Sequence, residues 1–167
     1  LFTFAIEAMG VSSGQIFGEY TYGQTMRWQW LGVPFVIALN WVVLTLAANL
    51  LVSRLFTPKA SPLSSGEGGG GGKDFSAEAR AKLSAAKALI IALAAGFVLA
   101  LYDVAIEPVA IKLDYWRWAT NEIPLQNYLA WALIAAIISW PLQYWRIRFE
   151  SPLLMIYFWA QLAFFII

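Results

Sequence analysis

The sequence predicts an all-α protein, a bundle of helices that cross a membrane. Hydrophobic residues make up 60% of the 167 residues, and the mean hydropathy is +0.65. Charged residues contribute 13%, about half of their share in soluble globular domains. We expect a single transmembrane domain over residues 1–167, with a partial helix at residues 1–9 and a last span that starts at Leu153. That span is expected to run past the last residue, so we take the sequence to be a segment of a longer chain.

Three complete spans are expected between these ends, at residues 31–52, 87–102 and 127–145. The first is about long enough to cross the hydrocarbon core as a helix. Pro34 is expected in the first turn of that span, whereas Pro108 and Pro141 are expected to end or kink the second and third. Residues 10–30 and 109–126 then form ordered connectors rich in aromatic residues, which favour the headgroup level of a bilayer.

Residues 54–83 break the apolar pattern and predict a flexible linker inside this domain. They contain Pro58, Pro62 and the glycine-rich run 66–72, and such a composition gives a flexible coil. A phosphate-binding loop is not indicated, because the glycine run is not followed by Lys and then Ser or Thr.

Basic residues predict the orientation of the bundle. Eight of the eleven Lys and Arg residues lie between the first two spans or in the short loop that precedes Ser151. The positive-inside rule places these segments in the cytoplasm. We therefore expect an integral protein of the cell (inner) membrane whose linker is cytoplasmic and whose two aromatic connectors lie on the opposite side.

The same topology brings acidic residues that are far apart in the sequence to one end of the bundle. Glu7, Asp103 and Glu107 follow apolar residues and are expected at membrane depth, where an ionisable side chain is costly and is a candidate functional group. Asp103 and Glu107 share a helix face because they are four residues apart. Burial, the second acid and the helix C-terminus all favour a neutral carboxylic acid. Glu19 and Asp114 are instead expected to pair with cations at the interface.

A neutral acid in an apolar pocket can protonate a group as weakly basic as an alkene, and a second carboxylate can hold and deprotonate water. Aromatic rings can stabilise the resulting carbocation by cation–π attraction. The candidate rings are those of Tyr20, Tyr22, Tyr115, Trp116 and Trp118. Asn40, in the first span, is either a helix–helix hydrogen-bonding group or a ligand contact.

Missing residue types narrow the chemistry. The chain has no Cys and no His, which excludes disulfide and thiolate chemistry and the zinc and di-iron sites that depend on imidazole. No metal site is expected. A net charge of +1, without a basic patch interleaved with aromatic residues, gives no indication of nucleic acid binding.

Two blocks of residues resemble a known family. The first is Glu-Ala-Met-Gly-Val-Ser-Ser-Gly-Gln-Ile-Phe-Gly-Glu-Tyr-Thr-Tyr at residues 7–22, followed by Leu-Gly-Val-Pro at 31–34 and by Asn40-Trp41. The second has Asp103 four residues before Glu107-Pro108, then Trp116-x-Trp118, then Ile-Pro-x-x-Asn-Tyr-x-x-Trp at 123–131. With these blocks the chain is similar to the membrane carotenoid biosynthesis protein family, which includes γ-carotene 1′-hydroxylases and bisanhydrobacterioruberin hydratases. This chain has Glu107 where the family pattern has Asp.

The resemblance implies a carotenoid hydratase, which adds water across the terminal double bond of an acyclic carotenoid end group to give a tertiary alcohol. No cofactor is implied, and membrane carotenoid hydroxylases that use oxygen need histidine-rich iron sites, which this chain lacks. The expected catalytic residues are Asp103, Glu7 and Glu107. The expected substrate-binding residues are Phe17, Tyr20, Tyr22, Asn40, Trp41, Tyr115, Trp116, Trp118, Asn127 and Trp131. The expected partners are the carotenoid, the lipid bilayer, and other membrane subunits or carotenoid enzymes.

Two other classes of function remain open from the sequence. One is a carotenoid- or pigment-binding subunit of a larger membrane complex, since aromatic helix surfaces serve that role equally well. The other is a transporter or channel in which Glu7 and Asp103 relay protons. The sequence contains neither the internal repeat nor the pair of broken helices that are typical of transporters.

Overall fold

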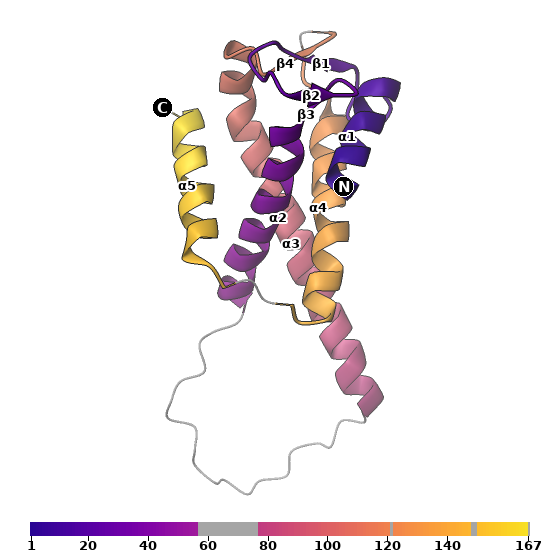
Figure 1. The fold of residues 1–167 in the computed structure, drawn as a ribbon. Helices are drawn as coiled ribbons and strands as arrows, with labels where there is room; N and C mark the ends of the chain where they lie inside the picture. The colour runs from indigo at the N-terminus through magenta and orange to yellow at the C-terminus, as the bar shows by residue number, and fades with distance from the viewer. Residues whose placement is uncertain (57–76, 121, 148–149, 167) are drawn as a thin grey trace, which may run out of the picture.

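Helices make up most of the part of the chain that the structure describes. The computed structural model describes residues 1–56, 77–120, 122–147 and 150–166, and within the third helix the side chains from Ser84 onward. In these residues the helices are α1 (Phe2–Ser13), α2 (Phe35–Phe56), α3 (Ala77–Lys112), α4 (Leu125–Tyr144) and α5 (Pro152–Ile166). They lie side by side in one bundle, with α5 and α1 on opposite sides of α2 in Figure 1.

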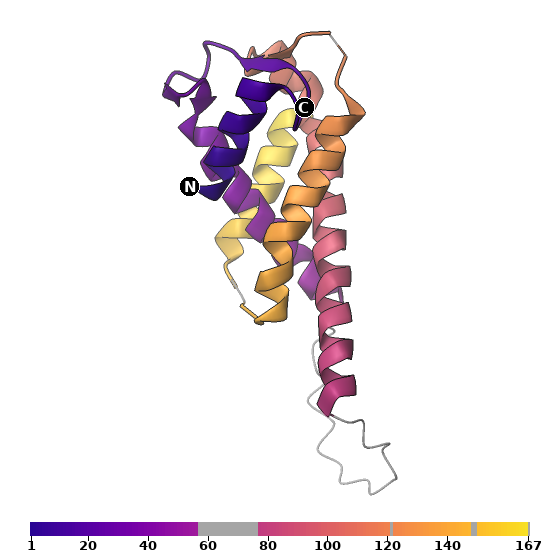
Figure 2. The same ribbon diagram turned by 90° about the vertical axis from the view of Figure 1, so that its right-hand side faces the viewer.

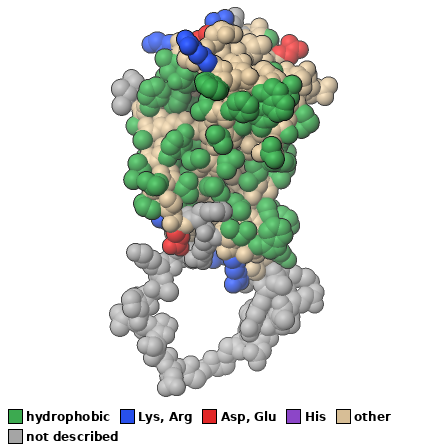
Figure 3. All heavy atoms as spheres, viewed as in Figure 1, with side chains coloured by type: hydrophobic (Ala, Val, Ile, Leu, Met, Phe, Trp, Pro, Cys, Tyr) green, Lys and Arg blue, Asp and Glu red, His purple; other side chains and the backbone are tan. Residues whose placement is uncertain are grey.

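Three of these helices are long and apolar enough to cross a membrane: α2, the part of α3 from Ser84 to Lys112, and α4. Each exposes large apolar side chains on its outer face, for example Leu39, Leu93 and Leu133, which are 67%, 55% and 60% exposed. Figure 3 shows hydrophobic side chains spread over the middle of one face, with charged side chains gathered at its two ends. A helix that is apolar all round suits the hydrocarbon core of a bilayer. The predicted all-α transmembrane bundle is therefore confirmed.

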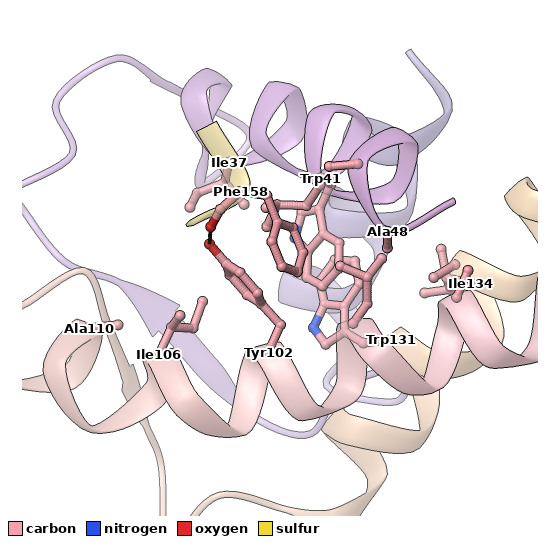
Figure 4. Packing of buried hydrophobic residues seen from close by; sticks show 14 of the residues in the cluster. Ile37, Trp41, Ala48, Tyr102, Ile106, Ala110, Trp131, Ile134 and Phe158 are labelled. Atoms are coloured by element: carbon pink, nitrogen blue, oxygen red, sulfur yellow. Dashed lines mark hydrogen bonds between the residues drawn. The ribbon is translucent and has the colours of Figure 1, made fainter. Parts of the chain in front are cut away.

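Small residues allow α3 and α4 to pack closely. Ala92 and Ala95 on α3 and Ala135 on α4 are fully buried. A side chain at Gly96 would collide with the backbone carbonyl of Ala132 on α4. Close approach through small residues is typical of helix pairs in membranes. The resulting core also contains larger rings, and Figure 4 shows those of Trp41, Tyr102, Trp131 and Phe158 packed between the helices.

Four short strands gather at one end of the bundle (Figures 1 and 2). They are β1 (Tyr20–Tyr22), β2 (Gln29–Trp30), β3 (Val33–Pro34) and β4 (Trp116–Trp118). β1 and β4 pair antiparallel, with Tyr20 opposite Trp118 and Tyr22 opposite Trp116, and β2 pairs antiparallel with β3. The two aromatic connectors therefore hydrogen-bond to each other, which the sequence analysis did not predict.

Several predicted boundaries were wrong. α1 continues from the expected end at residue 9 to Ser13 and ends at Gly14, whose φ of 65° is left-handed. Gly10 thus lies inside the helix, where its missing Cβ leaves room for the ring of Phe17. Pro34 lies in β3, before the first turn of α2. Pro108 does not end the second span: it removes one N–H donor, but the backbone bonds Leu113 N–H to Val109 O and Tyr115 N–H to Ala110 O complete the next turn.

The ends of the other elements are closer to expectation. Pro141 lies inside α4, which ends three residues later at Tyr144, and α5 begins at Pro152. α2 extends to Phe56 and α3 begins at Ala77, so helices take up both ends of the linker predicted at residues 54–83. The remainder of that predicted linker, including its glycine run, lies outside the described residues.

Candidate functional site

A cavity lies beneath the β1–β4 ribbon, at the end of the bundle that carries the strands. Its volume is about 50 Å³, which is enough for one or a few water molecules. Three acids that are far apart in the sequence line it, namely Glu7, Asp103 and Glu107. They are 0%, 4% and 1% exposed. Any charge they carry is therefore balanced by groups of the protein rather than by bulk water.

Glu7 is held by two phenol groups from β1. The hydroxyls of Tyr20 and Tyr22 both donate to Oε2 of Glu7, at 2.6 and 2.8 Å. Burial raises the pKa of both tyrosines well above the ordinary value of a tyrosine, and the negative charge of Glu7 raises it further. They therefore remain hydrogen-bond donors throughout the physiological pH range. The other carboxylate oxygen, Oε1, is buried and has no hydrogen-bond partner among the described residues.

Asp103 and Glu107 share one face of α3 and one donor from α4. The Nδ2 amide group of Asn127 donates to Oδ2 of Asp103 at 2.6 Å and to Oε1 of Glu107 at 3.4 Å. The indole N–H groups of Trp116 and Trp118 both donate to Oε2 of Glu107, at 2.9 and 3.2 Å. Glu107 thus has donors on both oxygens, whereas Asp103 accepts one bond, on Oδ2, from the residues that the structure describes. Continuation of α3 through Pro108 keeps the two acids on the same face.

The β1–β4 ribbon sorts its side chains by the two-residue period of a strand. In Tyr-Thr-Tyr and Trp-Arg-Trp, the aromatic residues face the cavity and supply the two phenol O–H donors to Glu7 and the two indole N–H donors to Glu107. The middle residues, Thr21 and Arg117, are opposite each other on the outer face and are exposed. Alternation of aromatic and polar residues in these two tripeptides fits the paired ribbon, but three residues are too few to predict the pairing from the sequence alone.

Aromatic rings form another wall of the cavity. The indole of Trp131 on α4 stacks on that of Trp41 on α2, and Phe17 stacks on Trp131 with ring centroids 4.7 Å apart. Figure 4 shows Trp41 and Trp131 facing each other between α2 and α4. Ring faces of this kind attract positive charge. The cavity thus combines carboxyl groups with surfaces that tolerate a cation.

Nine of the ten predicted substrate-binding residues line this cavity; Tyr115 does not. Tyr115 immediately precedes β4, so its side chain falls on the opposite side from that of Trp116 and packs against Phe165 on α5. Asn40 lines the cavity and also accepts a 2.6 Å hydrogen bond from Tyr157 on α5. It therefore joins α2 to α5, in agreement with the prediction of a helix–helix hydrogen bond. Asp114 pairs with Arg117 at 2.7 Å, which confirms its expected pairing with a cation.

Five further residues that line the cavity were not predicted from the sequence. They are Ile37, Leu44, Leu99, Tyr102 and Ile106. Helical periodicity could have identified them, because Leu99 and Ile106 flank Asp103 at spacings of four and three residues, and Ile37 and Leu44 flank Trp41 in the same way. Within the described residues, no cluster of His, Cys, Asp or Glu side chains could hold a metal ion.

A comparison with protein families decides the family. The model of a family described as "Carotenoid biosynthesis protein" matches residues 1–164. The chain belongs to the carotenoid biosynthesis protein family. A curated relative, the bisanhydrobacterioruberin hydratase of Haloarcula japonica, is 28% identical over 141 residues, which cover 82% of this chain and 40% of the relative. The chain therefore spans about two fifths of that relative's length, and no solved structure matches it.

The match to the carotenoid biosynthesis protein family covers every element that builds the cavity, from α1 with Glu7 to α4 with Asn127 and Trp131. The resemblance stated from the two sequence blocks is therefore confirmed. It gives the chain a role in carotenoid modification within a membrane.

Proposed function

We propose that this family member is a carotenoid hydratase, which adds water to the terminal double bond of an acyclic carotenoid end group and forms a tertiary alcohol. The observation that carries the proposal is the convergence of three buried carboxyl groups and an aromatic wall on one cavity. The Haloarcula japonica relative is named as a hydratase, which supports the same reaction type.

Asp103 is the proposed proton donor. Two carboxyl groups that share a site do not both ionise readily. The two indole N–H donors on Glu107 favour the ionised form of that residue, so the proton belongs on Asp103. In the reaction the O–H bond of Asp103 breaks, a C–H bond forms at the less substituted alkene carbon, and a tertiary carbocation remains. The carboxylates and other rings that line the cavity, among them those of Tyr20, Trp116 and Trp118, stabilise this cation.

Glu7 is the proposed base. Its Oε2 already accepts two phenol hydrogens, whereas its buried Oε1 is unpartnered among the described residues and can accept a hydrogen bond from water in the cavity. The water oxygen forms a C–O bond to the carbocation and loses its proton to Glu7. Transfer of that proton to Asp103 through cavity water restores both groups, so the net change is the addition of one water molecule and no cofactor takes part.

The carotenoid and the bilayer are the proposed partners, and other subunits or carotenoid enzymes are compatible with the exposed apolar faces. We further propose the inner membrane as the location, with the cavity at the non-cytoplasmic side. The basis is the positive-inside rule, applied to the basic residues at the far end of the bundle.

The proposal is tested by converting an acyclic-ended carotenoid in a heterologous membrane and separating the products by chromatography. Asp103→Asn keeps the shape of the side chain but cannot protonate an alkene, and general acid catalysis is worth about 10²–10⁴-fold. We expect a loss at or beyond the upper end of that range. Glu7→Gln should lose less, because an amide still holds water. Glu19→Gln, which alters an exposed carboxylate near β1, is the matched control and should convert normally.

The alternatives give different results in the same assay. If Asp103→Asn converts normally while Glu7→Gln is inactive, the two roles are exchanged. If both variants convert normally, the carboxylate mechanism is wrong. If the wild type retains the carotenoid without converting it, the chain is a pigment-binding subunit.

A further inference from the structure

A second cavity lies at the opposite end of the bundle from the three acids. Its volume is about 300 Å³, and it is lined by the last turns of α2 and α4, by α3 near Ser84, and by Arg146, Ile147 and Glu150 between α4 and α5. Lys87 in this cavity and Asp103 in the first are 16 residues apart on α3, which corresponds to about 24 Å along the helix. The tightly packed Ala92, Ala95 and Ala135 lie between the two cavities along α3 and α4. The second cavity is thus a separate feature.

Cations dominate the lining of this second cavity. Arg54, Lys87 and Arg146 contribute positive charge and Glu150 contributes one negative charge. Neutral polar groups come from Asn49, Ser53, Ser84 and Gln143, and an apolar floor from Leu46, Leu50, Ala88, Ile91, Leu142 and Ile147. Among the described residues, the structure contains an ion pair between Asp114 and Arg117, which lies at the other end of the bundle and does not involve the cations of the second cavity.

A hydrogen-bonded network fixes the polar wall. Nε2 of Gln143 on α4 donates to Oδ1 of Asn49 at 2.6 Å and to Oγ of Ser53 at 2.8 Å, both on α2. The amide of Asn49 donates in turn to Oγ of Ser139 on α4. Oγ of Ser53 accepts a bond from Gln143, and its own hydrogen has no acceptor among the described residues, so it can be donated to a ligand in the cavity.

The charge balance decides which sign of ligand the second cavity prefers. Its side chains carry three positive charges and one negative charge. α2 and α4 both end here, and each helix C-terminus contributes about half a negative charge. About one positive charge remains after this offset, so Arg54 and Arg146 do more than neutralise the helix ends. The cavity favours an anion.

We propose that this cavity binds a phosphate group, carried by a phospholipid of the adjacent leaflet. The cavity lies where the apolar band of the bundle gives way to charged side chains, as the lower end of Figure 3 shows. Phosphate oxygens suit the planar donor forks of Arg54 and Arg146 and the point charge of Lys87. The apolar floor, which includes Leu50 and Ile91, suits the glycerol and the first acyl carbons. Basic pockets between membrane helices bind anionic headgroups in this way.

The test measures lipid binding by the whole chain in neutral detergent micelles. Native mass spectrometry and thermal unfolding are recorded with phosphatidylglycerol, with phosphatidylcholine and with inorganic phosphate. The cavity variant is Lys87→Gln with Arg146→Gln. The control is Arg27→Gln with Lys112→Gln, which removes the same charge from exposed residues at the other end. Loss of a cation near an anionic headgroup weakens binding about fivefold, so we expect phosphatidylglycerol to bind the cavity variant roughly 30-fold more weakly and the control variant as well as the wild type.

The arms separate the possible sources of phosphate. Binding of phosphatidylglycerol without comparable binding of inorganic phosphate supports a lipid as the ligand. Binding of inorganic phosphate alone, with the same dependence on the two cations, would assign the site to free phosphate and show that the ligand is not a lipid. If neither probe binds the wild type better than the cavity variant, or if both double variants lose binding equally, the proposal is wrong. Unchanged thermal unfolding of the cavity variant without lipid shows that it remains folded.

Discussion

Removal of the two phenol groups on Glu7 gives a prediction whose size follows from the geometry. Tyr20→Phe and Tyr22→Phe each delete one short hydrogen bond to Oε2 of a carboxyl group that is 0% exposed. A hydrogen bond to a charged group contributes about 1.5–3 kcal/mol. Each variant should therefore lower the free energy of unfolding by about that amount if Glu7 is ionised.

The double variant Tyr20→Phe with Tyr22→Phe distinguishes an ionised Glu7 from a neutral one. Because Oε1 also accepts no hydrogen bond of normal geometry among the described residues, an ionised Glu7 would keep only the stabilisation that the nearby indole N–H of Trp41 provides. It then takes up a proton, so the double variant should cost less than the sum of the single ones. A protonated Glu7 cannot accept a proton from water, so conversion of the carotenoid should fall at least to the level of Glu7→Gln.

The assay is reversible unfolding in mixed micelles, combined with chromatography of the carotenoid products. Tyr157→Phe is the matched control, because it also deletes a phenol hydroxyl, here one that donates at 2.6 Å to the neutral amide oxygen of Asn40. That control should lose about 0.5–1.5 kcal/mol. The reasoning is refuted if Tyr20→Phe costs no more than Tyr157→Phe and the double variant still converts normally.

Two further predictions concern stability. Gly96→Val should lower the free energy of unfolding by about 1–3 kcal/mol, because the new side chain meets the backbone of Ala132. The control Leu93→Val, on the lipid-facing side, should have a smaller effect. Equal effects of the two variants would contradict the close packing of α3 and α4. High pH should destabilise the protein, because burial and Glu7 raise the pKa of Tyr20 and Tyr22 in the fold, whereas unfolded tyrosine ionises near pH 10. Their stabilisation is complete below that pH and falls above it by up to about 1.4 kcal/mol per pH unit for each tyrosine; an identical pH profile in the Tyr20→Phe, Tyr22→Phe double variant would contradict this.

Hydropathy and charge were sufficient to predict the helices and the end of the bundle at which the acids gather. Apolar spans and the distribution of basic residues are properties of whole segments, so they can be recognised in the sequence without knowing which residues are in contact. They predicted that Glu7, from α1, lies at the same end of the bundle as Asp103 and Glu107, from α3. The cavity that all three line agrees with that inference.

Features that depend on one contact between distant segments could not be predicted in the same way. The β1–β4 ribbon has three residues in each strand, too few for a strand signal without its partner. Gly10 resembles a helix terminator until the ring of Phe17 is seen to occupy the space beside it. Tyr115 belongs to the same aromatic run as Trp116, yet it packs against Phe165 on α5 instead of facing the cavity.

If the reaction is a hydration, the oxygen of the new hydroxyl group comes from water. The direct measurement is conversion of an acyclic-ended carotenoid in membranes that contain this protein, once in water labelled with oxygen-18 under ordinary oxygen and once in ordinary water under labelled oxygen gas. Mass spectrometry of the tertiary alcohol locates the label. We expect label from water and none from oxygen gas. Label from oxygen gas would rule out hydration and would require an oxygenase mechanism.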